Sequence, residues 1–141
     1  MRAEASQVIE RPVAAVFRFC AQEHVRNHPR WDPDIELEQT SDGPIRVGTV
    51  IRRRNSRSGK PVEGTLEVVE FEPERLFTGV IREGPVEVRG AMTFEALGAD
   101  RTKLTLSTEM PGADERWDPS LIAKGMERSL RNIKQLIEAE V

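Results

Sequence analysis

Apolar and polar residues alternate most clearly in the second half of the chain, over residues 86–97 and 102–110. One face of the first segment collects Val86, Val88, Gly90, Met92, Phe94 and Ala96. The second segment places Leu104, Leu106, Thr108 and Met110 on one face. A period of two is typical of a strand with one buried and one wet face. We therefore predict two strands here, each with an apolar face toward the core.

Turn-forming residues divide the rest of the chain into further strands. The expected strands are 3–9, 35–40, 47–54, 62–71 and 75–82, and Gly, Pro, Asn, Asp or Ser clusters lie between most of them. Several are spaced like consecutive hairpins, which predicts a mainly antiparallel sheet. In 62–71 the alternation slips between Val68 and Val69. A β-bulge near Val68 would reconcile the two halves and curve the sheet.

A long amphipathic helix is predicted over residues 119–139. Asp118 suits the N-cap and Pro119 the first helical position, where no N–H is needed. Its apolar stripe consists of Ile122, Met126, Leu130, Ile133, Leu136 and Ile137. Such a helix is roughly 30 Å long at about 1.5 Å per residue, which is enough to cross a small sheet.

Two short helices are predicted between the first two strands. Pro12 opens the first, in which Val13, Val16, Phe17 and Cys20 share one face. The second, about 22–27, is expected to end by His28, because Pro29 disfavours a helical conformation for the residue before it.

Length and composition favour a single domain over 1–141. No apolar run is long enough for a membrane span, and the first residues do not resemble a secretion signal, so a cytoplasmic location is expected. The single cysteine agrees with a reducing compartment. A net charge of −3, with the two signs mixed, argues against nucleic-acid binding.

Residues with chemical potential are few. His24 and His28 have the spacing of a metal-binding pair, with Asp32 as a third candidate ligand. The short helix and Pro29 favour solvated or capping histidines instead, so neither a metal nor a cofactor is expected. Cys20 lies on an apolar stripe without a nearby base, which predicts a buried and unreactive thiol.

Arg52, Arg53 and Arg54, followed by Arg57 and Lys60, form a basic hairpin. Such charge often only blocks edge-to-edge pairing of sheets, but it could also meet an anionic partner. Neighbouring strand residues point to opposite faces, so Arg53 or Arg54 could face inward and anchor an anionic or carbonyl-bearing ligand. The sequence does not decide between them, and Arg54 is kept among the candidate residues.

The order of elements and several short phrases resemble the helix-grip fold of the SRPBCC superfamily, in particular its polyketide cyclase/dehydrase and lipid transport group. The phrases are Ile9-Glu10-Arg11-Pro12 before Val16-Phe17, Trp31 with Pro33, Val47-Gly48-Thr49, the run 70–76, the run 102–105 and the closing run 130–138. The resemblance covers almost the whole chain. It implies an α+β helix-grip fold, with about seven antiparallel strands curved around the C-terminal helix and two short helices after the first strand.

The resemblance also implies an apolar cavity between the sheet and the last helix. Methionines suit irregular pockets, and Gly90 leaves a gap in an inward strand face. The candidate ligand-binding residues are Trp31, Arg54, Phe71, Phe77, Thr78, Gly90, Met92, Phe94, Thr108, Met110, Trp117, Ile122, Met126 and Leu130.

The favoured function is binding or transport of a small hydrophobic ligand such as a lipid, a polyketide-like ring or an isoprenoid. One alternative is an enzyme of the cyclase, aromatase or dehydratase type, although no general base is conspicuous. A second alternative is a toxin-like or assembly-factor interaction protein that uses the basic hairpin or the cavity mouth as its contact surface. A small hydrophobic molecule is the expected partner, without nucleic acid or stable membrane insertion. The oligomeric state stays open between monomer and dimer.

Overall fold

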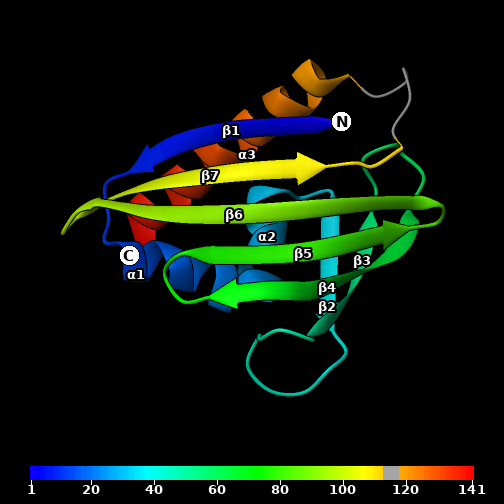
Figure 1. The fold of residues 1–141 in the computed structure, drawn as a ribbon, viewed down its shortest axis with the longest axis horizontal. Coiled ribbons are helices and arrows are strands. Elements are labelled where there is room, and N and C mark those ends of the chain that lie inside the picture. Colours follow the sequence, from blue (N-terminus) through cyan, green and yellow to red (C-terminus); the bar gives the residue numbers. More distant parts are fainter. Residues whose placement is uncertain (113–117) are drawn as a thin grey trace.

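The computed structural model describes residues 1–112 and 118–141, and within them seven strands form one antiparallel sheet (Figure 1). The strand order is β1-β7-β6-β5-β4-β3-β2. The strands are β1 (Arg2–Ile9), β2 (Ile35–Gln39), β3 (Val50–Asn55), β4 (Val62–Glu72), β5 (Leu76–Glu83), β6 (Val86–Gly98) and β7 (Arg101–Glu109). Consecutive strands pair from β2 to β7, and β1 joins β7 at the far edge, which confirms the predicted hairpin order.

Three short helical segments and one long helix complete the fold. They are α1 (Val13–Phe17), the π-helical turn η1 (Arg18–Gln22), α2 (His24–Trp31) and α3 (Pro119–Glu140). Figure 1 shows α3 behind β1 and β7, while β2 and β3 are turned steeply away from the direction of β6. The sheet therefore curves around the helix, and the predicted helix-grip fold is confirmed. None of the helices in the described ranges is both long and apolar enough to span a bilayer.

The predicted β-bulge lies in β4. The pairing between β4 and β5 shifts between Val68 and Glu70, which leaves Val69 as the extra residue. Val68 is fully buried, and beyond the bulge Phe71 pairs with the inward-facing Phe77. The bulge thus keeps apolar residues on the concave face along a strand whose simple alternation fails.

The C-terminal half of α3 is held firmly against β1. The Lys134 ammonium donates to the Val8 carbonyl at 2.9 Å, and the Arg11 guanidinium donates to the Glu138 carbonyl at 2.6 Å. On its buried side, Leu130, Ile133 and Ile137 fill the core. Among the described residues, no such hydrogen bond joins the N-terminal half of α3 to β1 or to the turn after it. This half of the helix lies over the part of the concave face that the core does not fill.

The structure corrects the expected end of the second helix. α2 runs to Trp31 and contains Pro29 in its interior, so the prediction that it ends by His28 is wrong. The indole of Trp31 is buried and stacks on His28 with ring centres 5.0 Å apart. Asn132 on α3 donates to the Trp31 carbonyl at 3.1 Å. These tertiary contacts outweigh the local cost of a proline in a short helix.

Candidate ligand-binding cavity

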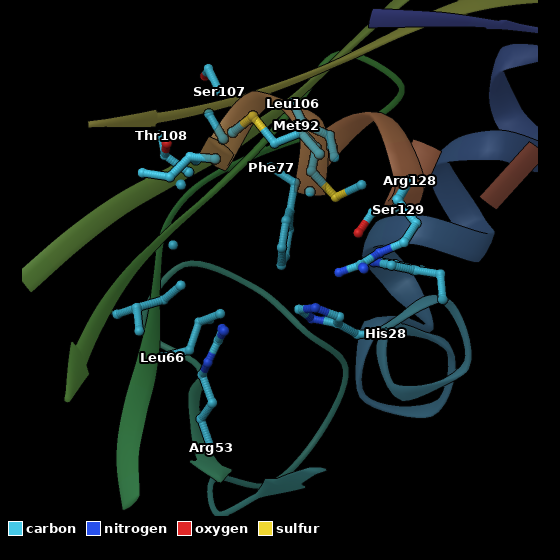
Figure 2. Close-up of a pocket in the computed structure, with 18 of the residues that line it drawn as sticks. His28, Arg53, Leu66, Phe77, Met92, Leu106, Ser107, Thr108, Arg128 and Ser129 are labelled. Carbon is cyan, nitrogen blue, oxygen red and sulfur yellow. The ribbon is translucent and has the colours of Figure 1, made fainter. Parts of the chain in front are cut away.

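A cavity of about 520 Å³ lies between the concave face of the sheet, α2 and the N-terminal half of α3 (Figure 2). The apolar core stops at this point. Phe17 packs edge-to-face on Phe71 and Phe94, with ring centres 5.3 and 5.0 Å apart, and fills the other end of the concave face. The protein is thus solid beneath the C-terminal half of α3 and hollow beneath its beginning.

The floor of the cavity is made by the inward residues of β4 to β7. Phe77, Ile81, Met92 and Leu106 are among its apolar residues. Gly90 deepens it. Gly79 and Gly90 face each other across the β5–β6 pair, and a Cβ atom added at Gly90 would meet nothing within 4 Å. The missing side chain of Gly90 therefore creates part of the empty volume, whereas the space next to Gly79 is occupied by the Leu66 side chain, 3.0 Å from where a Cβ would lie.

The other walls come from α3 and α2. Leu121, Ile122, Gly125 and Met126 of α3 cover the floor, and Trp31 of α2 closes one side. The Asp118 carboxylate caps α3 by accepting from the Ser120 amide at 2.9 Å, as predicted for an N-cap. Leu121, next to this cap, is 64% exposed, so the apolar lining reaches the surface at the start of α3.

One end of the cavity is polar, and Arg53 of β3 is its most buried charge. The residue is only 6% exposed and shares the inward face with Ile51, two positions before it. Its Nε lies 4.0 Å from a Glu83 carboxylate oxygen, too far for a hydrogen bond. Burial lowers the pKa of the Arg53 guanidinium and Glu83 raises it, but an arginine stays charged in proteins.

The two histidines of α2 form a hydrogen-bonded chain beside Arg53. The His24 Nδ1 lies 2.9 Å from the Cys20 carbonyl, which can only accept, so this nitrogen carries the proton. In a neutral His24 the Nε2 is then an acceptor, and it lies 3.0 Å from the His28 Nδ1. His28 must donate from Nδ1, so its own Nε2 is unprotonated. A basic nitrogen is thereby presented at the cavity.

Both imidazoles are held neutral by their surroundings. The pKa of His24 is lowered to about 4, mainly by burial; the hydrogen bond to Cys20 acts in the opposite direction, and the charge of Arg53 contributes to the lowering. Burial also lowers the pKa of His28 well below its usual value, and His24, Arg53 and Arg57 act in the same direction. Asp32, which is paired with Arg57, lies 4.0 Å from the His28 Nε2.

Half of the residues predicted from the sequence line this cavity, and the others do not. The lining residues are Trp31, Phe77, Gly90, Met92, Thr108, Ile122 and Met126. Phe71, Phe94 and Leu130 belong instead to the packed core, and Met110 is buried outside the cavity. Thr78 is out of phase with its lining neighbours Phe77 and Gly79. Trp117 lies outside the described residues.

Arg54 is also misplaced by the sequence prediction. Its side chain is half exposed on the convex face and lies near Glu36 and Glu63, at 3.7 and 3.9 Å. The alternation of the strand could have shown this. Arg53 lies two positions after Ile51 and therefore points to the same face, and an isoleucine at that position is expected to be buried. The arginines of β3 also do not protect a sheet edge from pairing, because β3 lies between β2 and β4.

The histidines are the main functional groups that sequence reasoning placed wrongly. His24 is buried and His28 is 14% exposed, so neither is a solvated side chain, and His24 bonds the Cys20 carbonyl of η1 from within the core. His24, His28 and Trp31 are spaced four and three apart, which puts them on one helical stripe with a large apolar residue. The large apolar residue on this stripe was a signal that the stripe faces the core. Within residues 1–112 and 118–141, no three His, Cys, Asp or Glu side chains gather as metal ligands would.

Cys20 lies next to this chain but takes no part in the cavity surface. It is fully buried, and burial raises the pKa of its thiol. The prediction of a buried thiol is confirmed. A sulfur that is protonated and inaccessible is a poor nucleophile.

Comparison with solved structures gives the same fold over the whole chain. A START superfamily protein from Mycobacterium smegmatis has a TM-score of 0.82 at 11% identity, covering 99% of each chain. The ginseng major latex-like protein 151 from Panax ginseng has a TM-score of 0.76 at 16% identity, covering 96% of this chain and 95% of its own. The Zhui aromatase/cyclase from Streptomyces sp. R1128 has a TM-score of 0.73 at 16% identity, covering 98% and 93%.

These identities are low, so the structural likeness establishes the fold alone. A search of curated proteins finds no match. The family described as polyketide cyclase/dehydrase and lipid transport matches residues 1–138. Since that match spans nearly the whole sequence, the chain belongs to this family of the SRPBCC superfamily.

Proposed function

We propose that the protein binds a small, mainly apolar molecule in the cavity beneath the N-terminal half of α3. The observation that carries this proposal is the hollow at Gly90, floored by Phe77, Ile81 and Met92. A water-filled apolar hollow is costly, and a ligand that fills it gains about 2.5 kcal/mol for each 100 Å² of its apolar surface removed from water. The family match supports the same class of ligand.

The test is displacement of water by a neutral fluorescent probe. N-phenyl-1-naphthylamine, whose emission rises in apolar surroundings, should bind the wild-type protein. Gly90→Leu should abolish the signal, because the new side chain enters open space within the cavity. Thr93→Leu is the matched control, since Thr93 is exposed on the same strand. Equal binding by the two variants would place the probe elsewhere and contradict the proposal.

The natural ligand can be sought directly. Native mass spectrometry of wild-type protein purified from its own host should show an additional small mass, which Gly90→Leu protein prepared in parallel should lack. An identical mass on both proteins would indicate binding outside the cavity.

A catalytic alternative is favoured by one observation. The unprotonated Nε2 of His28 and the buried guanidinium of Arg53 border the same cavity, as a general base and an oxyanion-stabilising donor would. The reaction class would then be cyclisation or dehydration of a carbonyl-bearing chain. In that case His28→Gln should abolish turnover and leave probe binding intact. If the variant keeps full turnover, His28 is not the base.

A further inference from the structure

Two buried polar groups that line the cavity have no hydrogen-bond partner among the described residues, the Thr108 hydroxyl and the guanidinium Nε of Arg53, and only Arg53 carries a charge. The carboxylate nearest to this Nε, that of Glu83, stays 4.0 Å away. A buried charge without hydrogen bonds is costly. In Figure 2 the side chain reaches into the cavity from β3 and points toward the space below Phe77. The Arg53 Nε therefore has no acceptor within hydrogen-bond distance, and the buried Oε2 of Glu83 beside it is unpartnered as well.

His28 has the opposite requirement. Its Nε2 is an acceptor while the ring is neutral, and the carboxylate of Asp32, 4.0 Å away, cannot donate to it. Figure 2 shows the His28 ring reaching into the same space from α2. The polar end thus presents one side chain that needs an acceptor and one that needs a proton.

The charges around this end already balance. Glu83 lies beside Arg53, and Asp32 pairs with Arg57. His24, which faces His28 from the same helix, is neutral. From α3, Arg128 and the cap residue Asp118 contribute one charge of each sign to the cavity lining. Adding a lone charge would be costly in such surroundings, so the fitting head group is neutral overall and brings both an acceptor and a proton.

We infer that the cavity selects apolar carboxylic acids and takes up one proton from solvent with each bound carboxylate. This rests on the proposed function. The two carboxylate oxygens accept from Arg53, the geometry in which a guanidinium binds most strongly. The proton goes to the Nε2 of His28, which becomes a donor to the carboxylate or to Asp32. Its Nδ1 continues to donate to His24, so the hydrogen-bond chain is kept.

Two naphthalene derivatives of similar size test this inference by isothermal titration calorimetry. The acid is 2-naphthoate, and the control is the methyl ketone 2-acetonaphthone, which accepts hydrogen bonds but carries no charge. Titrations in buffers with different enthalpies of ionisation give the number of protons taken up. We expect close to one for the acid near neutral pH and none for the ketone. Between pH 8 and pH 6 the affinity for the acid should rise about tenfold per pH unit.

Two variants assign the roles. Arg53→Gln should weaken binding of the acid roughly 10- to 100-fold, as loss of charge-assisted hydrogen bonds does, and weaken binding of the ketone less, because its carbonyl accepts a hydrogen bond without forming an ion pair. His28→Gln cannot take up a proton, so the proton count and the pH slope for the acid should both vanish. Retention of proton uptake in this variant would assign the proton elsewhere and overturn the role of His28.

The outcomes separate this inference from the proposal beneath it. If the ketone binds in the cavity but the acid binds no tighter at pH 6, or binds without proton uptake, the selectivity for acids is refuted and the apolar cavity stands. If neither compound binds and N-phenyl-1-naphthylamine also fails to bind, the proposed function itself fails.

Discussion

Replacing His24 by asparagine should flatten the pH dependence of stability. In the wild-type protein the pKa of His24 is about 4, against 6.5 for an unperturbed histidine. The unfolded chain therefore binds more protons than the folded one between these values, and stability falls as the pH drops through that window. From pH 7 to pH 5 this single group removes about 2 kcal/mol of unfolding free energy. The lowered pKa of His28 adds to the loss in the same direction.

The asparagine amide can occupy the position of the imidazole Nδ1 and donate to the Cys20 carbonyl, but it does not titrate. Urea unfolding of both proteins at pH 7, 6 and 5 measures the effect. His24→Asn starts from a lower stability because part of a buried ring is lost, so the comparison is between slopes. The wild type should lose about 2 kcal/mol more than the variant between pH 7 and pH 5, equivalent to roughly 4–8 °C in melting temperature. Parallel curves for the two proteins would refute the burial of a neutral His24.

Further predictions concern packing and the start of α3. Gly64→Ala should destabilise the fold by roughly 1–3 kcal/mol, because its Cβ would lie 2.3 Å from the Arg82 carbonyl oxygen. Gly90→Ala, with open space around its Cβ, should change thermal stability by less than about 0.5 kcal/mol; equal effects of the two substitutions would contradict the described packing. Leu130→Ala should cost about 2–5 kcal/mol in denaturant unfolding, since Leu130 is buried in the filled half of the core. Asp118→Ala should cost about 1 kcal/mol by removing the N-cap of α3, and no change would show that the cap is dispensable.

Sequence patterns were sufficient for the elements and their order. Alternation with period two marked the strands on either side of Gly98, and the slip at Val68 marked the bulge, because each side chain in a strand must choose one face. The apolar stripe and the Asp118–Pro119 start marked α3. These are local signals, and each depends only on neighbours within a few positions.

The division of the core into a filled and a hollow half is a tertiary property. Phe94 and Met92 share one strand face, yet only Met92 lines the cavity, because Phe17 of α1 occupies the space in front of Phe94. Likewise, Leu130 packs in the core while Met126, one turn earlier, faces the hollow. No local pattern records which part of a concave face a distant helix will fill.

The polar end of the cavity was decided in the same way. The sequence alone offered two histidines four apart and three consecutive arginines, and both patterns also suit a wet surface. Folding α2 against the sheet buried His24 and His28 and made their pKa values fall, and pairing β3 between two other strands turned Arg53 inward. The sequence by itself determined a curved sheet around a long helix. Only the tertiary structure decided that a buried guanidinium and an unprotonated imidazole face one cavity, because burial and charge depend on residues far apart in the chain.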